Sequence, residues 1–141
     1  MSASKWKSYT DFSATSLVWS RSLPCHWGTK RLRNIFEVKK RIAGKLGYDV
    51  LAVTKSGLKI KDISSGEGQL AADYSTYQIV EKGDFAMNHM DLISGFVGLS
   101  SQLGVTSPDY RVFTLKNPED CHEYFLYLLE MCYLEKIFFY F

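Results

Sequence analysis

The sequence predicts an α/β fold in which a twisted, β-rich core carries short peripheral helices and a packed C-terminal helix. Three observations lead to this prediction. Short apolar runs separated by glycine-containing turns fill the middle of the chain, as is typical of antiparallel strands. An apolar stripe at helical spacing lies near the C-terminus. The 141 residues are enough for one compact domain with a core, and no internal repeat interrupts them.

The N-terminal segment, residues 1–22, is predicted to be an irregular arm, because it is rich in Ser and Thr and shows no sustained hydrophobic period. The domain proper is expected over residues 23–141 and begins with a turn at residues 23–27. A basic run follows, which predicts a strand or a short helix. Gly44 and Gly47 then indicate a loop, since glycine gives the backbone conformational freedom.

Two predicted hairpins and three further strands make up the middle of the chain. Residues 55–57 form a glycine-containing turn between two apolar runs, and such a turn joins antiparallel strands. Residues 81–83 separate two more apolar runs in the same way, so we expect a second hairpin there. The predicted strands are residues 49–53, 58–60, 77–80, 84–87, 95–99, 104–106 and 110–115.

The C-terminal helix is predicted to begin at Pro118. Asn117 is a favourable helix-capping residue, and Glu119 and Asp120 would place negative charge at the positive end of the helix dipole. One apolar stripe of this helix should be buried against the sheet, which would place two cysteines in the core. The stripe consists of Cys121, Tyr124, Phe125, Leu128, Leu129 and Cys132.

Cysteine usage and the N-terminal sequence both indicate an intracellular protein. The three cysteines are odd in number and far apart, which favours reduced thiols over a disulfide framework. The first twenty residues lack the continuous apolar run of a signal peptide or a membrane span. We therefore expect a cytoplasmic protein with no membrane partner.

Charge is strongly polarised along the chain. Residues 1–61 contain 13 Lys and Arg against 3 Asp and Glu, whereas residues 62–141 contain 4 against 12. The resulting net charges of +10 and −8 leave two explanations open. The basic half could present one face to a polyanion, because phosphate attraction needs locally clustered positive charge. Alternatively, the two halves could neutralise each other across the fold.

Motifs for catalysis are weak or missing. No phosphate-binding glycine loop or dinucleotide motif occurs in the sequence. The histidines are isolated or directly adjacent to a cysteine, and adjacent residues cannot easily share one tetrahedral ion. We therefore expect a non-catalytic chain that holds no metal or cofactor of its own. A small metal-dependent nuclease using Glu67, Asp84 and Asp91 is a less favoured alternative, since Asp84 follows a glycine turn where Asp is favoured by local hydrogen bonding.

Three motifs together suggest a protein family. Residues 19–27 read Trp-Ser-Arg-Ser-Leu-Pro-Cys-His-Trp and directly precede a basic segment. A Gly-Asp turn at residues 83–84 is followed by Ser-Pro-Asp-Tyr at residues 107–110 and then by the predicted helix. From Trp19 onwards the chain resembles the DNA specificity subunits of type I restriction-modification systems. It is similar to a single target-recognition domain, whereas full subunits carry two. Because it also ends on the apolar run 137–141, we expect a truncated piece.

The resemblance implies a chain that recognises a DNA target and leaves catalysis to other subunits. Its partners would be double-stranded DNA, a methyltransferase (M) subunit and, through the assembled complex, a restriction (R) subunit. S-adenosylmethionine, ATP and Mg²⁺ would be held by those partner subunits. Lys and Arg would neutralise phosphates, and polar side chains on loops would read base edges in the major groove. The predicted phosphate contacts are Lys30, Arg31, Arg33, Lys39, Lys40, Arg41, Lys45, Lys55, Lys59 and Lys61, and the predicted base-reading loop residues are Asn88 and His89.

A protein-interaction module is the main alternative to DNA recognition. In this interpretation the acidic half and the apolar C-terminal stripe dock a partner protein, and DNA binding is incidental. Weak DNA binding that does not depend on sequence would favour it.

Overall fold

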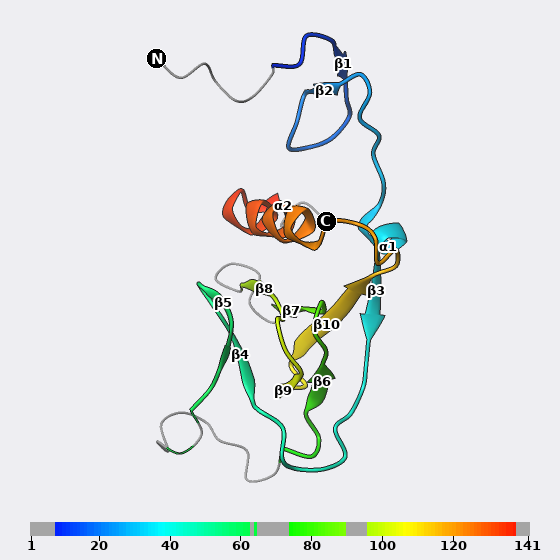
Figure 1. Ribbon diagram of the computed structural model, residues 1–141. Helices are drawn as coiled ribbons and strands as arrows, with labels where there is room; N and C mark the ends of the chain where they lie inside the picture. Colours follow the sequence, from blue (N-terminus) through cyan, green and yellow to red (C-terminus); the bar gives the residue numbers. More distant parts are fainter. Residues whose placement is uncertain (1–7, 63, 65–73, 90–95, 138–141) are drawn as a thin grey trace, which may run out of the picture.

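A computed structural model of the chain describes residues 8–62, 64, 74–89 and 96–137. Within these residues, short strands outnumber helices, and one longer helix lies near the C-terminus (Figure 1). This confirms the prediction of a mixed, sheet-rich fold with a C-terminal helix. The elements are β1 (Phe12–Ala14), β2 (Ser22–Pro24), α1 (Leu32–Ile35), β3 (Phe36–Lys39), β4 (Leu51–Thr54), β5 (Gly57–Ile60), β6 (Gln78–Val80), β7 (Phe85–Asn88), β8 (Val97–Leu99), β9 (Gly104–Thr106), β10 (Tyr110–Leu115) and α2 (His122–Leu134).

A four-stranded antiparallel sheet in the order β3-β10-β7-β8 forms the centre of the molecule. Helix α2 lies across one face of this sheet (Figure 1). The β4–β5 hairpin packs against β8, at the opposite end of the strand order from β3. The strands β6 and β9 form a separate two-stranded sheet.

Strand β10 places apolar side chains on both faces of the central sheet, because successive residues of a strand point in opposite directions. Phe113 and Leu115 join a buried cluster that includes Leu129 of α2. Val112, directly before Phe113, points to the other face and belongs to a second buried cluster with Leu51 of β4. The ring of Phe36 contacts three other rings of the first cluster edge-on, with centroids 5.1–5.5 Å apart. The core therefore consists of two apolar layers that share β10.

One of the two predicted hairpins is confirmed. Strands β4 and β5 pair antiparallel, and Gly57 at their turn has a φ of 93°, a conformation that favours glycine. The second predicted hairpin is wrong, because β6 pairs with β9 whereas β7 pairs with β8 and β10. The Gly83 N–H donates to the Ser100 carbonyl at 2.8 Å, and Ser100 N–H donates to the Asp84 carbonyl at 2.8 Å. These bonds join the turn after β6 to the end of β8, so the chain passes from one sheet into the other.

Helix α2 begins at His122, four residues later than predicted. The Asn117 side chain accepts a hydrogen bond from the Glu119 N–H at 3.2 Å and donates one to Asp120 Oδ1 at 2.9 Å. Asn117 therefore closes a turn before the helix instead of capping it. Cys121 becomes the N-cap residue and is exposed, so its predicted place in the core is wrong. Cys132 is buried as predicted, and burial raises the pKa of its thiol.

The predicted irregular arm contains a small hairpin. Strands β1 and β2 pair antiparallel, with Phe12 opposite Pro24, so the hairpin crosses the expected boundary at residue 22. Each strand has only three residues, and all but Leu23 and Pro24 are exposed, so neither shows a hydrophobic alternation. The Tyr9 ring contacts the Trp27 ring edge-on, with the centroids 5.7 Å apart.

We expect Gly98→Ala to lower the free energy of unfolding by about 1–3 kcal/mol, because a side chain there overpacks the contact between β8 and the β4–β5 hairpin. A Cβ atom on Gly98 would lie 2.7 Å from the Leu58 backbone nitrogen and 2.9 Å from Leu58 Cγ. Urea unfolding followed by circular dichroism measures the change. Gly28→Ala is the matched control, since among the described residues no atom beyond its two chain neighbours lies within 4 Å of a Cβ there. Equal stability of the two variants would contradict this packing.

Candidate nucleic-acid interface

The ten predicted phosphate contacts divide between two ends of the central sheet. Strand β3 is one end of the strand order, and the hairpin that packs against β8 is at the other (Figure 1). A straight duplex contacts one face of a small domain, so the two groups do not form a single binding surface. The segment that runs from residue 30 through α1 and β3 into the following loop carries Lys30, Arg31, Arg33, Lys39, Lys40, Arg41 and Lys45, whereas Lys55, Lys59 and Lys61 belong to the hairpin and the residue after it.

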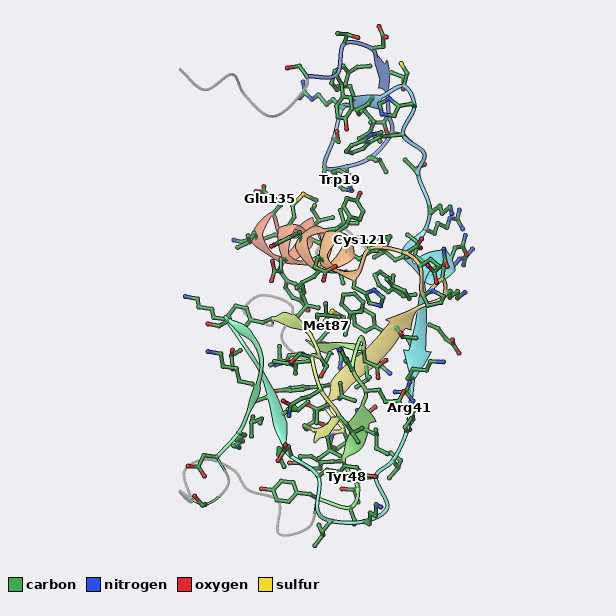
Figure 2. The ribbon with its side chains drawn as sticks, viewed as in Figure 1. Trp19, Arg41, Tyr48, Met87, Cys121 and Glu135 are labelled. Carbon is green, nitrogen blue, oxygen red and sulfur yellow. The ribbon has the colours of Figure 1, made fainter. Side chains whose placement is uncertain are left out.

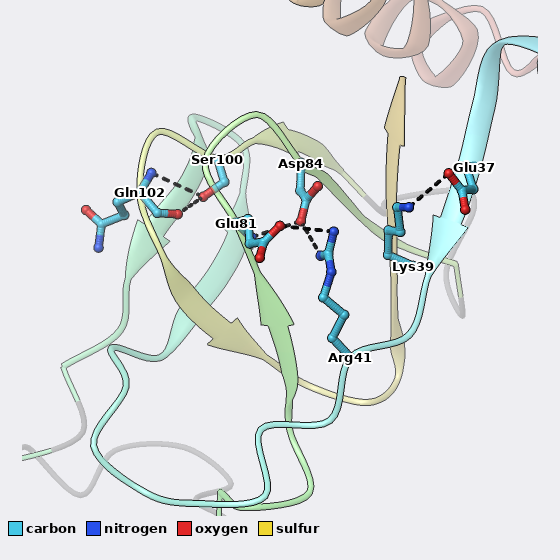
Figure 3. A network of polar contacts seen from close by, with 7 residues as sticks. All are labelled: Glu37, Lys39, Arg41, Glu81, Asp84, Ser100 and Gln102. Carbon is cyan, nitrogen blue, oxygen red and sulfur yellow. Dashed lines mark hydrogen bonds and ion pairs between the residues drawn. The ribbon is translucent and has the colours of Figure 1, made fainter. Parts of the chain in front are cut away.

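Arg41 is paired with carboxylates of the acidic half of the chain (Figure 3). Its Nη1 lies 2.7 Å from Asp84 Oδ2, and its Nη2 lies 3.2 Å from Glu81 Oε2. Asp84 is only 3% exposed and also accepts the Glu81 backbone N–H at 2.8 Å. A buried carboxylate needs such partners, because an unpaired buried charge is costly. The geometry therefore gives Arg41 a structural partner, and its predicted phosphate contact stays a prediction.

The ion pair between Arg41 and Asp84 argues against the nuclease alternative. Asp84 is buried and bound to Arg41, so it offers no open carboxylate to a metal ion. Glu67 and Asp91 lie outside the described residues. In the part of the chain that the structure describes, no group of three His, Cys, Asp or Glu side chains could hold a metal ion. The geometry at Asp84 gives the nuclease alternative no support.

Lys39 and Glu37 form an exposed ion pair on β3, with Nζ and Oε2 2.9 Å apart. The hydrogen bond and charge of Lys39 lower the pKa of the Glu37 carboxyl, and Lys116 and Arg41 lower it further. Solvent screens a pair of this kind strongly, so it contributes little to stability. Several cations nevertheless act on one carboxyl, which indicates a positive local potential at this edge of the sheet.

The cations around α1 are the most accessible of the predicted set. Lys30, Arg31 and Arg33 are exposed, and the ion pairs found in the described residues do not involve them. Lys116, at the end of β10, joins this group because its Nζ donates to the Arg33 carbonyl at 2.9 Å. Sequence clustering could not identify Lys116, since it lies in the acidic half and the pairing of β10 with β3 brings it here.

A hollow of about 420 Å³ continues this basic surface between α1 and the start of α2. Lys30 and Lys116 give it positive charge, and Asp120 gives it one negative charge. The mixed polar lining suits a small charged group better than an apolar ligand. The remaining lining residues are Asn34, Ile35, Asn117, Cys121, Tyr124 and Phe125.

The two predicted base-reading residues lie at the other end of β10 from α1. Asn88 is the last residue of β7, opposite Tyr110, so its predicted place in a loop is wrong. Its backbone N–H donates to the Phe96 carbonyl at 3.2 Å. His89 follows the strand, and its Nδ1 is buried with no hydrogen-bond partner among the described residues. Their role in reading bases stays a prediction.

No protein-family model, curated protein or solved structure matches this chain. The resemblance to type I specificity subunits therefore depends on its sequence motifs alone. None of the helices in the described ranges is long and apolar enough to cross a membrane.

We expect Arg41→Ala to lower the free energy of unfolding by about 3–5 kcal/mol, because it leaves the buried Asp84 carboxylate without its counter-charge. Urea unfolding measures the loss. Lys39→Ala is the matched control, since it removes a cation from an exposed pair and should leave stability nearly unchanged. Adding Asp84→Asn to Arg41→Ala should restore part of the loss. An Arg41→Ala variant as stable as the parent would show that the pair contributes nothing.

Proposed function

We propose that the chain is a DNA-binding module whose α1–β3 edge contacts the phosphate backbone. The observation that carries the proposal is the group of exposed cations around α1, extended by Lys40 beyond β3 and by Lys116 from β10. Cations that are clustered and free of carboxylate partners release counterions when they meet phosphates, and this release drives binding.

The arrangement suggests how a duplex would run. The α1 cations lie beside Phe36, which pairs with Leu115, whereas Asn88 pairs with Tyr110 at the other end of β10. Six strand residues separate these ends by about 17 Å. A duplex aligned with β3 would meet the α1 cations first and Lys40 next, with Asn88 at the far end. The contacts of Lys and Arg with phosphates would fix the position of the protein along the duplex, and the contact of Asn88 with a base would supply sequence selectivity.

The finer proposal is that this module is a target-recognition domain of the type I restriction-modification kind. It would direct methyltransferase and restriction subunits to a DNA site and have no catalytic role of its own. The motifs at residues 19–27, 83–84 and 107–110 support it. A mixed, sheet-rich domain with a basic edge is compatible with it.

Binding to a randomised DNA duplex pool at two salt concentrations, with sequencing of the retained DNA, tests both the general DNA-binding proposal and the target-recognition proposal. An enriched motif of a few base pairs is the result expected for target recognition. Tight binding without an enriched motif would support the phosphate contacts and contradict target recognition. No binding by a folded chain would overturn the proposal and favour the protein-interaction module.

We expect a triple variant with Lys30→Gln, Arg31→Gln and Arg33→Gln to bind DNA more weakly for all sequences. If each cation meets one phosphate, the slope of log affinity against log salt falls by about 2.7. The matched control replaces Lys55, Lys59 and Lys61 by Gln, which removes the same charge at the other end of the sheet. Equal losses in the two variants would contradict a binding surface at α1.

A further inference from the structure

Helix α2 carries apolar residues on its outer face as well as on the face that packs against the sheet. Leu129, Cys132 and Tyr133 are buried. On the outer face, Tyr127 is 69% exposed and Leu134 is 81% exposed. A helix that is apolar all round is normally buried on all sides. The outer face of α2 therefore has the composition of a contact surface.

The outer apolar residues follow the spacing of a coiled-coil seam. Tyr124, Tyr127, Met131 and Leu134 are separated by three, four and three residues, which is the a-d-a-d pattern of a heptad repeat. Tyr124 is 51% exposed, and Met131 is partly exposed. From Tyr124 to Leu134 these residues form a seam about 15 Å long on α2. We call these four residues the outer seam.

Acidic residues flank the outer seam. With Tyr124 at an a position, Glu123 and Glu130 occupy g positions and Glu135 occupies an e position. No Lys or Arg occurs between residues 117 and 135. Figure 2 shows Cys121 and Glu135 at the two ends of α2, so the acidic flank follows most of the helix. Charges at e and g positions select the partner of a coiled coil, because opposite charges attract across the seam.

We propose that the outer seam of α2 docks a basic amphipathic helix of a partner protein, with apolar residues at a and d and Lys or Arg at e and g. A second copy of α2 fits poorly, because Glu would face Glu along the flank. The β1–β2 hairpin of this chain offers exposed aromatic rings such as Trp19 in its turn, but it lacks the helical ridges that pack between helices. Tyr124 also lines the hollow that Lys30 and Lys116 share, but Tyr127, Met131 and Leu134 do not, so most of this surface is separate from the proposed DNA contact and goes beyond it.

Three labelled synthetic peptides of roughly three heptads test the proposal against the full chain by fluorescence anisotropy. The first has Leu at a and d and Lys at e and g. The second has Glu in place of Lys, and the third scrambles the order of the first. The first peptide should bind at least about tenfold more tightly than either of the others.

Two sets of variants locate the binding surface. Tyr127→Ser with Leu134→Ser should weaken binding of the basic peptide at least about tenfold, and its helix content by circular dichroism checks its fold. Replacing Glu123, Glu130 and Glu135 by Gln should remove the preference for the basic over the acidic peptide. Tyr9→Ser with Phe12→Ser is the control on the hairpin and should bind normally. The α1 triple variant should also bind normally, which separates this surface from the DNA contact.

Three outcomes would overturn the proposal. Equal binding of the scrambled peptide would reduce the contact to charge attraction. Binding of neither ordered peptide would leave the outer seam without a helical partner. Sedimentation that shows a dimer of the chain, abolished by Leu134→Ser, would identify a second copy as the occupant.

Discussion

Strand β10 is the element on which the rest of the molecule depends. It is paired on both sides, with β3 and with β7, and its side chains enter both apolar layers of the core. Its ladder with β3 holds α1 in place, and the chain leads from its end through the Asn117 turn into α2. The basic edge and the helix therefore keep their relative positions through one six-residue strand. A change that breaks this strand would affect both surfaces at once.

The polarised charge of the chain is used in two ways. Arg41 of the basic half is paired with Glu81 and Asp84 of the acidic half, as expected if the halves neutralise each other. Lys30 and Arg31 remain exposed at α1 and leave a positive surface. The acidic residues of α2 lie on a separate element with no cation among them. Neutralisation across the fold therefore applies at Arg41, whereas contact of the α1 cations with a polyanion stays a proposal.

Local signals predicted the local structure. The turn at Gly57 predicted the β4–β5 hairpin, because a glycine at positive φ between apolar runs acts within a few residues. The pairing of β6 with β9 escaped prediction, since it joins residues far apart in the sequence and a similar glycine turn suggested a closer partner. Asn117 suggested a helix cap, but its side chain closes a turn. In each error, the structure forms a different contact from the one that the neighbouring residues in the sequence suggested.

The two candidate surfaces, the α1 cations and the outer seam of α2, could also be predicted from the sequence only in part. Sequence clustering identified the cations at residues 30–33, but it could not divide the ten predicted cations between two ends of a sheet or add Lys116 to α1. The outer seam of α2 went unnoticed because the stripe chosen for the core already contained Tyr124, which is in fact exposed. Apolar spacing identifies a helix, but it does not say which of two apolar faces meets the sheet.

The position of β3 has a consequence for the chain in solution. Among the described strands it is the end of its sheet, so one row of its backbone groups lacks a neighbouring strand. Such edges pair readily with other chains and aggregate, and charged side chains oppose this. Glu37, Lys39 and Lys40 place charges along this edge, beside the exposed Val38. Lys39 and Lys40 would therefore oppose edge-to-edge aggregation, and we expect mutations that neutralise them to lower solubility even where no ligand is present.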